Sequence, residues 1–235
     1  MAYITELHCH TAEISACATV FSKDIADKYA EYGYTTLTVM NHLSRFTFAS
    51  SKSKYTGGDD WNEKIDFFLS GYKIMEEAAD SRFNVLWGIE LRLNTDENDY
   101  LIYGVTEDFL RAHPEILDLP VKALSSLVHD EGLLLFQAHP FRNSIRITKP
   151  SLLDGIETYN GHPGHDSRNN IAILWAEQFG LKQISGTDFH HEYHFPTGGI
   201  VTEFPIRTNE ELVKVLKSGE YEVLNAGTRP VNALK

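Results

Sequence analysis

Two histidines near the start of the chain, His8 and His10, have types and spacing that suit metal chemistry. They lie in Glu6-Leu7-His8-Cys9-His10-Thr11, a stretch that the residues before it predict to be a strand. Successive side chains of a strand point to opposite faces, so His8 and His10 point the same way and Cys9 points away. Two neighbouring imidazoles make half of a metal site. The pattern therefore predicts a metal centre whose other ligands come from elsewhere in the chain.

Further candidate ligands follow the predicted strands, at or just past their ends. They are His42, Glu90, His139, Asp188 and His190. In an α/β barrel these strand ends converge on one face, where active sites are built. The mixed nitrogen and oxygen donors suit Zn, Mn or Fe better than Ca, which prefers oxygen alone. Seven donors exceed the needs of one tetrahedral ion, so we expect two or three ions.

Predicted strands and helices alternate along the chain and would position these ligands. Hydrophobic spacing predicts helices over 22–33, 61–79, 121–128 and 171–179, and a last helix after 208. Strands are predicted for the opening segment, 36–42, 83–91, 100–105, 133–136, 156–159 and from 183, with 83–91 and 100–105 forming a hairpin. The segment 44–60 is long for a loop and is expected to be an active-site flap or a mobile segment. This alternation indicates a parallel α/β architecture.

The composition fits one enzyme-sized domain over residues 1–235. The chain has 21 basic and 33 acidic residues and a net charge of −12. Such acidity argues against binding of duplex nucleic acid, which needs a basic face. It does not exclude an anionic substrate, because bound divalent cations invert the local field.

The cellular setting is predicted from what the sequence lacks. Cys9 and Cys17 are the only cysteines, which excludes a disulfide scaffold and suits a reducing compartment. Met1 leads directly into a strand rather than a signal peptide, and no apolar run approaches bilayer length. We therefore expect a soluble, cytoplasmic protein without a membrane partner. The sequence does not indicate an oligomeric state.

Five segments together resemble the polymerase-and-histidinol-phosphatase (PHP) family of metal-dependent phosphoesterases. They are Glu6-Leu7-His8-Cys9-His10-Thr11, Val39-Met40-Asn41-His42, Gly88-Ile89-Glu90, Gln137-Ala138-His139-Pro140 and Ser185-Gly186-Thr187-Asp188-Phe189-His190. The resemblance implies a distorted, TIM-like, seven-stranded (β/α) barrel with two or three divalent ions. It also assigns ligands: His8, His10, Glu90 and Asp188 to a first ion, Glu90 and His139 to a second, and His42 and His190 to a third.

The chain departs from the family pattern at three places. Met40-Asn41-His42 lacks the acidic residue that commonly precedes this histidine. Ser15 and Ala16 stand where many members carry another ligand, which leaves Glu13 as the nearest candidate. Tyr103-Gly104-Val105 offers no histidine after the Glu90 motif. The second and third ions are therefore less firmly predicted than the first.

Polar residues near the predicted centre suit an anionic substrate. Arg142 and Arg168 are the candidate phosphate ligands, because guanidinium groups bind phosphate through two parallel hydrogen bonds. Each is alternatively a surface arginine in a solvated loop. Asn160 and His162 are further candidate substrate contacts, and His162 is a candidate for orienting the leaving group. No side chain is assigned a catalytic role beyond holding the ions.

The predicted function is metal-dependent hydrolysis of phosphate esters, with a small phosphomonoester as the favoured substrate. A metal-bound hydroxide would attack phosphorus. A PHP-type exonuclease or phosphodiesterase acting on short oligonucleotides is one alternative. Another is an amidohydrolase-like enzyme that cleaves C–N or C–O bonds, and a third is a non-catalytic metal-binding domain. Motifs for dinucleotide binding, P-loop nucleotide binding and serine hydrolysis are absent from the sequence.

Overall fold

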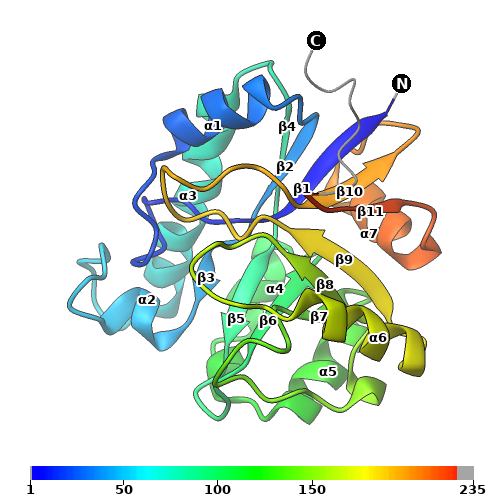
Figure 1. Ribbon diagram of the computed structural model, residues 1–235. Coiled ribbons are helices and arrows are strands. Elements are labelled where there is room, and N and C mark those ends of the chain that lie inside the picture. Colours follow the sequence, from blue (N-terminus) through cyan, green and yellow to red (C-terminus); the bar gives the residue numbers. More distant parts are fainter. Residues whose placement is uncertain (1, 227–235) are drawn as a thin grey trace.

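The computed structural model describes residues 2–226, whose strands form two sheets (Figure 1). The first sheet contains, in spatial order, β11 (Glu222–Leu224), β10 (Gly199–Thr202), β1 (Tyr3–Cys9), β2 (Thr36–Val39) and β4 (Asn84–Trp87). The second contains β3 (His42–Leu43), β5 (Ile89–Arg92), β6 (Asp99–Tyr103), β7 (Leu134–Gln137), β8 (Gly155–Asn160) and β9 (Lys182–Gly186).

Seven α-helices in the described residues accompany the sheets. They are α1 (Ser22–Glu31), α2 (Arg45–Ala49), α3 (Trp61–Ala79), α4 (Glu107–Ala112), α5 (Val121–Asp130), α6 (Asn169–Phe179) and α7 (Asn209–Ser218), with short 3-10 turns at Ile116–Asp118 and Pro150–Leu152. The helices predicted from hydrophobic spacing are all present. The predicted loop 44–60 contains α2, whose start carries a capping box between Ser44 and Thr47.

The two sheets differ from the predicted closed barrel. Among the described residues neither sheet closes on itself, so the structure confirms a mixed α/β fold but not a closed seven-stranded barrel. The pairs β1/β10, β10/β11, β5/β6 and β6/β7 are antiparallel, so the arrangement is only partly parallel. The β5/β6 pair is the predicted hairpin.

The predicted strand 83–91 is interrupted at Gly88, and its halves join different sheets as β4 and β5. A Cβ atom at Gly88 would lie 2.6 Å from the carbonyl oxygen of Ile102 and 2.6 Å from Met40 Sδ. Only glycine permits this close approach. The chain therefore leaves the first sheet here and places Glu90 in the second.

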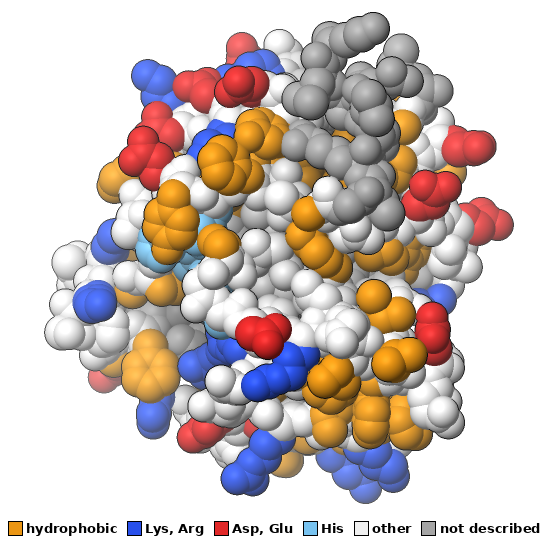
Figure 2. Space-filling model, viewed as in Figure 1, with side chains coloured by type: hydrophobic (Ala, Val, Ile, Leu, Met, Phe, Trp, Pro, Cys, Tyr) orange, Lys and Arg blue, Asp and Glu red, His pale blue; other side chains and the backbone are white. Residues whose placement is uncertain are grey.

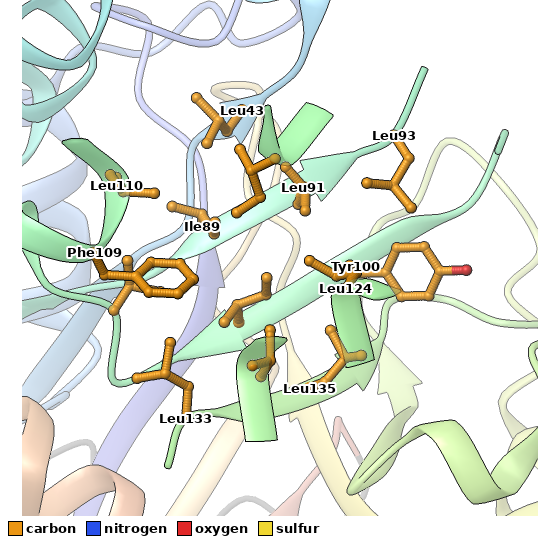
Figure 3. Close-up of a cluster of buried hydrophobic side chains, with 14 of the residues drawn as sticks. Leu43, Ile89, Leu91, Leu93, Tyr100, Phe109, Leu110, Leu124, Leu133 and Leu135 are labelled. Atoms are coloured by element: carbon orange, nitrogen blue, oxygen red, sulfur yellow. The ribbon is translucent and has the colours of Figure 1, made fainter. Parts of the chain in front are cut away.

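A hydrophobic core lies between the second sheet and helices α4 and α5. Alternate residues of β5, Ile89 and Leu91, point into this core with Tyr100, Leu124 and Leu135 (Figure 3). Because side chains alternate along a strand, Glu90 and Arg92 point to the opposite face. Packing of one face thus orients these two polar side chains toward the other.

Another apolar cluster contains residues from both sheets. It combines Leu7 and Leu86 of the first, and Met40 just after β2, with Leu101 and Phe136 of the second. The two sheets therefore face one another across a shared interior. They also contact where β1 passes β9 (Figure 1), and an isolated bridge joins Cys9 to Phe189 just after β9. The ends of β1, β7, β8 and β9 meet at one edge of this interior. No helix in the described part of the chain is long and apolar enough to cross a bilayer.

Candidate metal centre

The first group of candidate ligands surrounds the end of β1. The Nε2 atoms of His8 and His10 lie 3.0 Å apart. The His8 and His10 atoms lie 3.5 and 3.3 Å, respectively, from Asp188 Oδ1. They lie 3.4 and 3.2 Å, respectively, from Glu90 Oε2. All four side chains are buried. The structure thus brings together four predicted ligands that are separated by up to 180 residues in the sequence.

These distances fit donors that share one ion. Zinc-type ligands lie about 2.0–2.2 Å from the metal, and two of them 90–110° apart are separated by about 2.8–3.6 Å. Every distance in the first group falls in this range. Glu90 Oε2 is also buried, and ring nitrogens of His8, His10 and His42 lie 3.4, 3.2 and 2.8 Å from it. A buried carboxylate oxygen surrounded by imidazole nitrogens suits a cation that they would bind together.

Two residues behind the first group hold it in place. Glu157 Oε1 accepts a hydrogen bond from His8 Nδ1 at 2.9 Å, which directs His8 Nε2 to the cluster. Glu157 Oε2 accepts hydrogen bonds from the backbone N–H of His139 and from Asn160 Nδ2, both at 2.9 Å. Glu157 was not predicted. The signal was present, however, since a carboxylate lies inside the strand predicted over 156–159.

Asn160, a predicted substrate contact, is placed behind the ligands rather than in the pocket. Its Nδ2 donates to Asp188 Oδ2 at 3.1 Å as well as to Glu157. Its Oδ1 accepts from the His162 backbone N–H and from Ser167 Oγ. The amide is therefore fully occupied in orienting Asp188, and it has no free donor for a substrate.

A second group of ligands extends from the other oxygen of Glu90. Glu90 Oε1 lies 3.2 Å from His139 Nε2, which in turn lies 3.7 Å from Asp99 Oδ2. A carboxylate with one oxygen in each group suits a bridge between two ions. Asp99 was not predicted, and it supplies a donor on the strand where the sequence offers no histidine. It begins β6, and because β6 is antiparallel to β5 and β7 its start lies beside their site-facing ends.

A third group contains His42 and His190, with His10 shared from the first. Their ring nitrogens lie within 4.8 Å of one another. Cys17 lines the same pocket. Although burial opposes ionisation, the adjacent His42 and His190 lower the pKa of its thiol to about 4. Cys17 is not among the residues predicted for the site, because its neighbours come from β3 and the segment after β9.

The carboxylates and imidazoles of the three ligand groups strongly shift one another's pKa values. Burial opposes charge on Glu90 and Asp188, but the surrounding imidazoles hold the pKa of both carboxyl groups well below the usual range. In the same way burial disfavours a charged His190, but Asp188 raises its pKa to about 10. Protons on imidazoles thus balance the buried carboxylates in the metal-free chain. Divalent cations would replace these protons.

Glu13 is the predicted ligand that the structure places outside these groups. Its Oε1 accepts a hydrogen bond from the backbone N–H of Ser22 at 2.9 Å, at the start of α1. The first N–H groups of a helix have no partner within the helix, and a carboxylate there is favourable. Glu13 therefore stabilises α1, and nothing in its contacts associates it with the candidate metal ligands.

Arg142 and His162 line a pocket of about 420 Å³ over the three ligand groups, and Arg168 does not. The guanidinium of Arg142 lies 3.3 Å from Asp99 Oδ2 and remains partly exposed. The Arg168 guanidinium instead donates to the carbonyl of Phe141 and to Asn143 Oδ1. Arg168 thus ties two loops together, while Arg142 remains available to an anion.

The His162 ring stacks on a histidine that was not predicted, His165, with ring centroids 4.5 Å apart. His165 Nε2 lies 3.7 Å from Asp188 Oδ2 and is buried without a hydrogen-bond partner in the described structure. Burial lowers the pKa of His162 to about 3, so its ring is neutral near pH 7. Its Nδ1 accepts from the Gly164 N–H, which leaves the proton on Nε2.

Two candidate ligands have backbone conformations that favour glycine. His139 has φ of 28° and Asp188 has φ of 54°. Non-glycine residues in this region are strained, and such residues cluster at functional sites. The backbone N–H of His139 is held by Glu157, and that of Asp188 donates to the carbonyl of His8 at 2.8 Å. These contacts maintain both turns.

Comparison with known proteins gives structural matches only. No protein-family model matches the sequence, and no curated protein matches it. A two-domain protein from Bacteroides vulgatus containing a predicted PHP-like metal-dependent phosphoesterase is similar, with a TM-score of 0.64 and 15% identity. The match covers 94% of this chain and 64% of that one.

Two further solved structures share the fold. The lesion-specific endonuclease EndoQ from Pyrococcus furiosus matches with a TM-score of 0.67 and 14% identity, over 95% of this chain and 58% of its own. An amidohydrolase from Chromobacterium violaceum, solved with bound sulfate, matches with a TM-score of 0.55 and 14% identity, over 94% and 98% of the two chains.

EndoQ has also been solved with a 27-mer duplex at its active site. Nucleic acid is therefore a ligand of a protein with this fold, and the expectation that net acidity argues against duplex nucleic acid is not supported. The chain has the fold of the PHP-like metal-dependent phosphoesterases, which confirms the resemblance stated from its sequence motifs.

Proposed function

We propose that this chain is a hydrolase of phosphate esters that depends on two or three divalent ions. The observation that carries the proposal is the spacing of His8, His10, Glu90 and Asp188, whose donor atoms are separated like neighbouring ligands of one ion. The same fold in PHP-like phosphoesterases supports it. Mixed nitrogen and oxygen ligands favour Zn, Mn or Fe.

The residues would divide among the ions as follows. The first group would hold one ion, Glu90 would bridge to a second on His139 and Asp99, and His42 and His190 would hold a third. Ions in such sites acidify water and neutralise the charge of the phosphoryl group. Glu157 and Asn160 would orient the ligands from behind.

The remaining pocket residues would act on the substrate. Arg142 has guanidinium N–H groups facing the pocket and would bind a phosphoryl oxygen. Neutral His162 would donate a hydrogen bond from Nε2 to the substrate or leaving group. Its low pKa favours the neutral ring over a cationic acid near pH 7. A pocket of about 420 Å³ would accept either a small phosphomonoester, which the sequence analysis favours, or one nucleotide of a strand.

A substrate panel tests the proposal. The protein would be assayed with added Mn²⁺ on p-nitrophenyl phosphate, bis(p-nitrophenyl) phosphate, an anilide and a lactone. We expect hydrolysis of phosphate esters and a loss of about 100-fold or more in Asp188→Asn. Glu13→Gln is the matched control, because it makes the same chemical change at a carboxylate outside the centre, and it should stay within about threefold of wild type.

Two results would overturn the proposal. Activity only on the anilide or lactone would assign amidohydrolase-type chemistry instead. Equal losses in the Asp188 and Glu13 variants would show that the candidate metal centre is not where the reaction occurs.

A further inference from the structure

A groove adjoins the pocket of about 420 Å³ over the three ligand groups, which is called the metal pocket below. It has a volume of about 550 Å³ and shares Ser44, Phe46, Arg92 and Arg142 with that pocket. Beyond these residues it runs between the loop after β5 and the loop after β7. The metal pocket is therefore one end of a longer channel, which is more than a small phosphomonoester requires.

Four arginines line this groove in an otherwise acidic protein. They are Arg45, Arg92, Arg142 and Arg146, against the two carboxylates Asp96 and Glu97. The whole chain carries a net charge of −12, so the groove is a local reversal of sign. On the face in Figure 2, Lys and Arg side chains gather just below the histidines. A low-dielectric groove of one sign attracts ligands of the other.

The arginines near the metal pocket retain a net positive charge. Asp99 accepts hydrogen bonds from Arg92 Nε at 2.6 Å and from Arg92 Nη2 at 2.5 Å, and Arg142 Nη2 lies 3.3 Å from it. One carboxylate thus faces two guanidinium groups. A phosphate beside them would complete the charge balance.

The guanidinium groups of the outer arginines, Arg45 and Arg146, lack ion-pair partners in the described structure. The peptide of Arg146 is fixed on both sides, since its N–H donates to Asn98 Oδ1 at 2.9 Å and its carbonyl accepts from Gln137 Nε2 at 2.8 Å. The Arg45 guanidinium lies 4.7 Å from the Phe46 ring centroid. Phe46 stands at the junction of the two pockets and is 49% exposed.

We infer that this groove binds the backbone phosphates of a single-stranded nucleic acid whose reacting phosphate lies at the metal centre, with a base against Phe46. The inference rests on the proposed function and specifies its substrate. Arginines along a groove with an interleaved aromatic ring are the arrangement that binds single strands. An unpaired base can stack on Phe46, whereas a paired base presents no free face.

Binding is tested with a fluorescein-labelled eight-nucleotide thymidine strand carrying phosphorothioate linkages, which resist hydrolysis and keep their charge. Fluorescence anisotropy would compare wild type with Arg45→Ala/Arg146→Ala and with Phe46→Ala. We expect about tenfold weaker binding in each variant. The double arginine variant should also lower the slope of log Kd against log salt by about 1.4, the value for two lost phosphate contacts on a single strand.

The control is Lys122→Ala/Arg207→Ala, which removes two positive charges from exposed positions that do not line the groove. It should bind the strand like wild type. If it weakens binding as much as the groove variant, the attraction is general electrostatics and the inference is wrong. Absence of binding by wild type, or preference for an eight-base-pair duplex over the strand, would also overturn it.

A kinetic comparison separates this inference from the proposed function. With Mn²⁺, the ratio of kcat/KM for an unmodified thymidine octamer to that for bis(p-nitrophenyl) phosphate should fall about tenfold in Arg45→Ala/Arg146→Ala. An unchanged ratio would refute the groove while leaving phosphoester hydrolysis in place. If wild type hydrolyses neither compound, the proposed function fails, and the binding experiment alone decides the groove.

Discussion

Each histidine of the first ligand group is oriented by a partner on the side away from the cluster. His8 donates from Nδ1 to Glu157, and His10 Nδ1 lies 3.2 Å from Ser15 Oγ. Both Nε2 atoms are thereby directed to the same point. Such partners fix the ring orientation and increase the basicity of the ligating nitrogen. The histidines at the end of β1 are therefore ordered before any ion binds.

Protons and ions compete for these nitrogens, which predicts a pH dependence. Although burial opposes charge, Asp188 raises the pKa of His190 to about 10 in the metal-free chain. His190 therefore carries a proton between pH 7 and 9 and must release it to bind an ion. The proton on His190 alone should make the affinity for the ion on His42 and His190 rise about tenfold per pH unit in this range and weaken as the pH falls. His42 should steepen this rise because, although burial opposes its charge, Glu90 raises its pKa. Calorimetry of Mn²⁺ binding in two buffers of different ionisation enthalpy would measure the release.

The sign of this effect is unambiguous, because a raised histidine pKa favours the protonated, metal-free form at lower pH. His190→Gln removes the titrating group and should lose one released proton. Ion binding that releases no proton and is flat from pH 7 to 9 would contradict the account.

The sequence predicted most of the candidate ligands, because residue type and position after a strand are local properties. His8, His10, Glu90, His139 and Asp188 were all identified in this way. Glu13 was a candidate by its place in the chain, but its carboxylate is used by α1. Asp99 was missed because its place depends on an antiparallel pairing, and the roles of Glu157 and Asn160 depend on which strands are neighbours. These relations exist only after folding.

At the scale of elements, the turns after β7 and β9 present ligands from strained backbone. His139, with φ of 28°, follows β7, and glycine would relieve its strain at the cost of the ligand. Both His139→Gly and His139→Ala remove the imidazole. The difference between their free energies of unfolding therefore reports the backbone strain alone. We expect the glycine variant of the metal-free protein to be more stable by about 1 kcal/mol. Thermal unfolding should show a Tm about 2–4 °C higher.

His113 provides the matched control, because its φ of −123° is outside the left-handed region that favours glycine. His113→Gly should be no more stable than His113→Ala. If His139→Ala equals or exceeds His139→Gly in stability, the turn after β7 is not strained.

Strand positions followed from the sequence, but sheet membership did not. Gly88 was included within a single strand over 83–91, whereas the structure divides this segment at Gly88 into β4 and β5, which belong to different sheets. Hydrophobic periodicity indicates which residues are buried. It does not indicate that β4 pairs with β2 while β5 pairs with β6.

At the scale of the whole molecule, two curved sheets bring the ends of β1, β7, β8 and β9 to one edge, and the ligands meet there. The net charge of the chain does not show how charge is distributed over its surface. A chain with a net charge of −12 places four arginines in one groove beside the buried histidines and carboxylates of the candidate metal centre. The fold is shared with phosphoesterases, an endonuclease and an amidohydrolase, so the chemistry is decided by the residues at this edge rather than by the sheets.

The most direct test of the central claim is anomalous X-ray diffraction from crystals grown with Mn²⁺, measured to locate the ions. We expect one peak within about 2.3 Å of donor atoms of His8, His10 and Asp188, and a second between Glu90 and His139. The first peak should disappear in Asp188→Asn, and both peaks should persist in Glu13→Gln. Crystals that bind Mn²⁺ elsewhere while leaving these donors without a peak would contradict it.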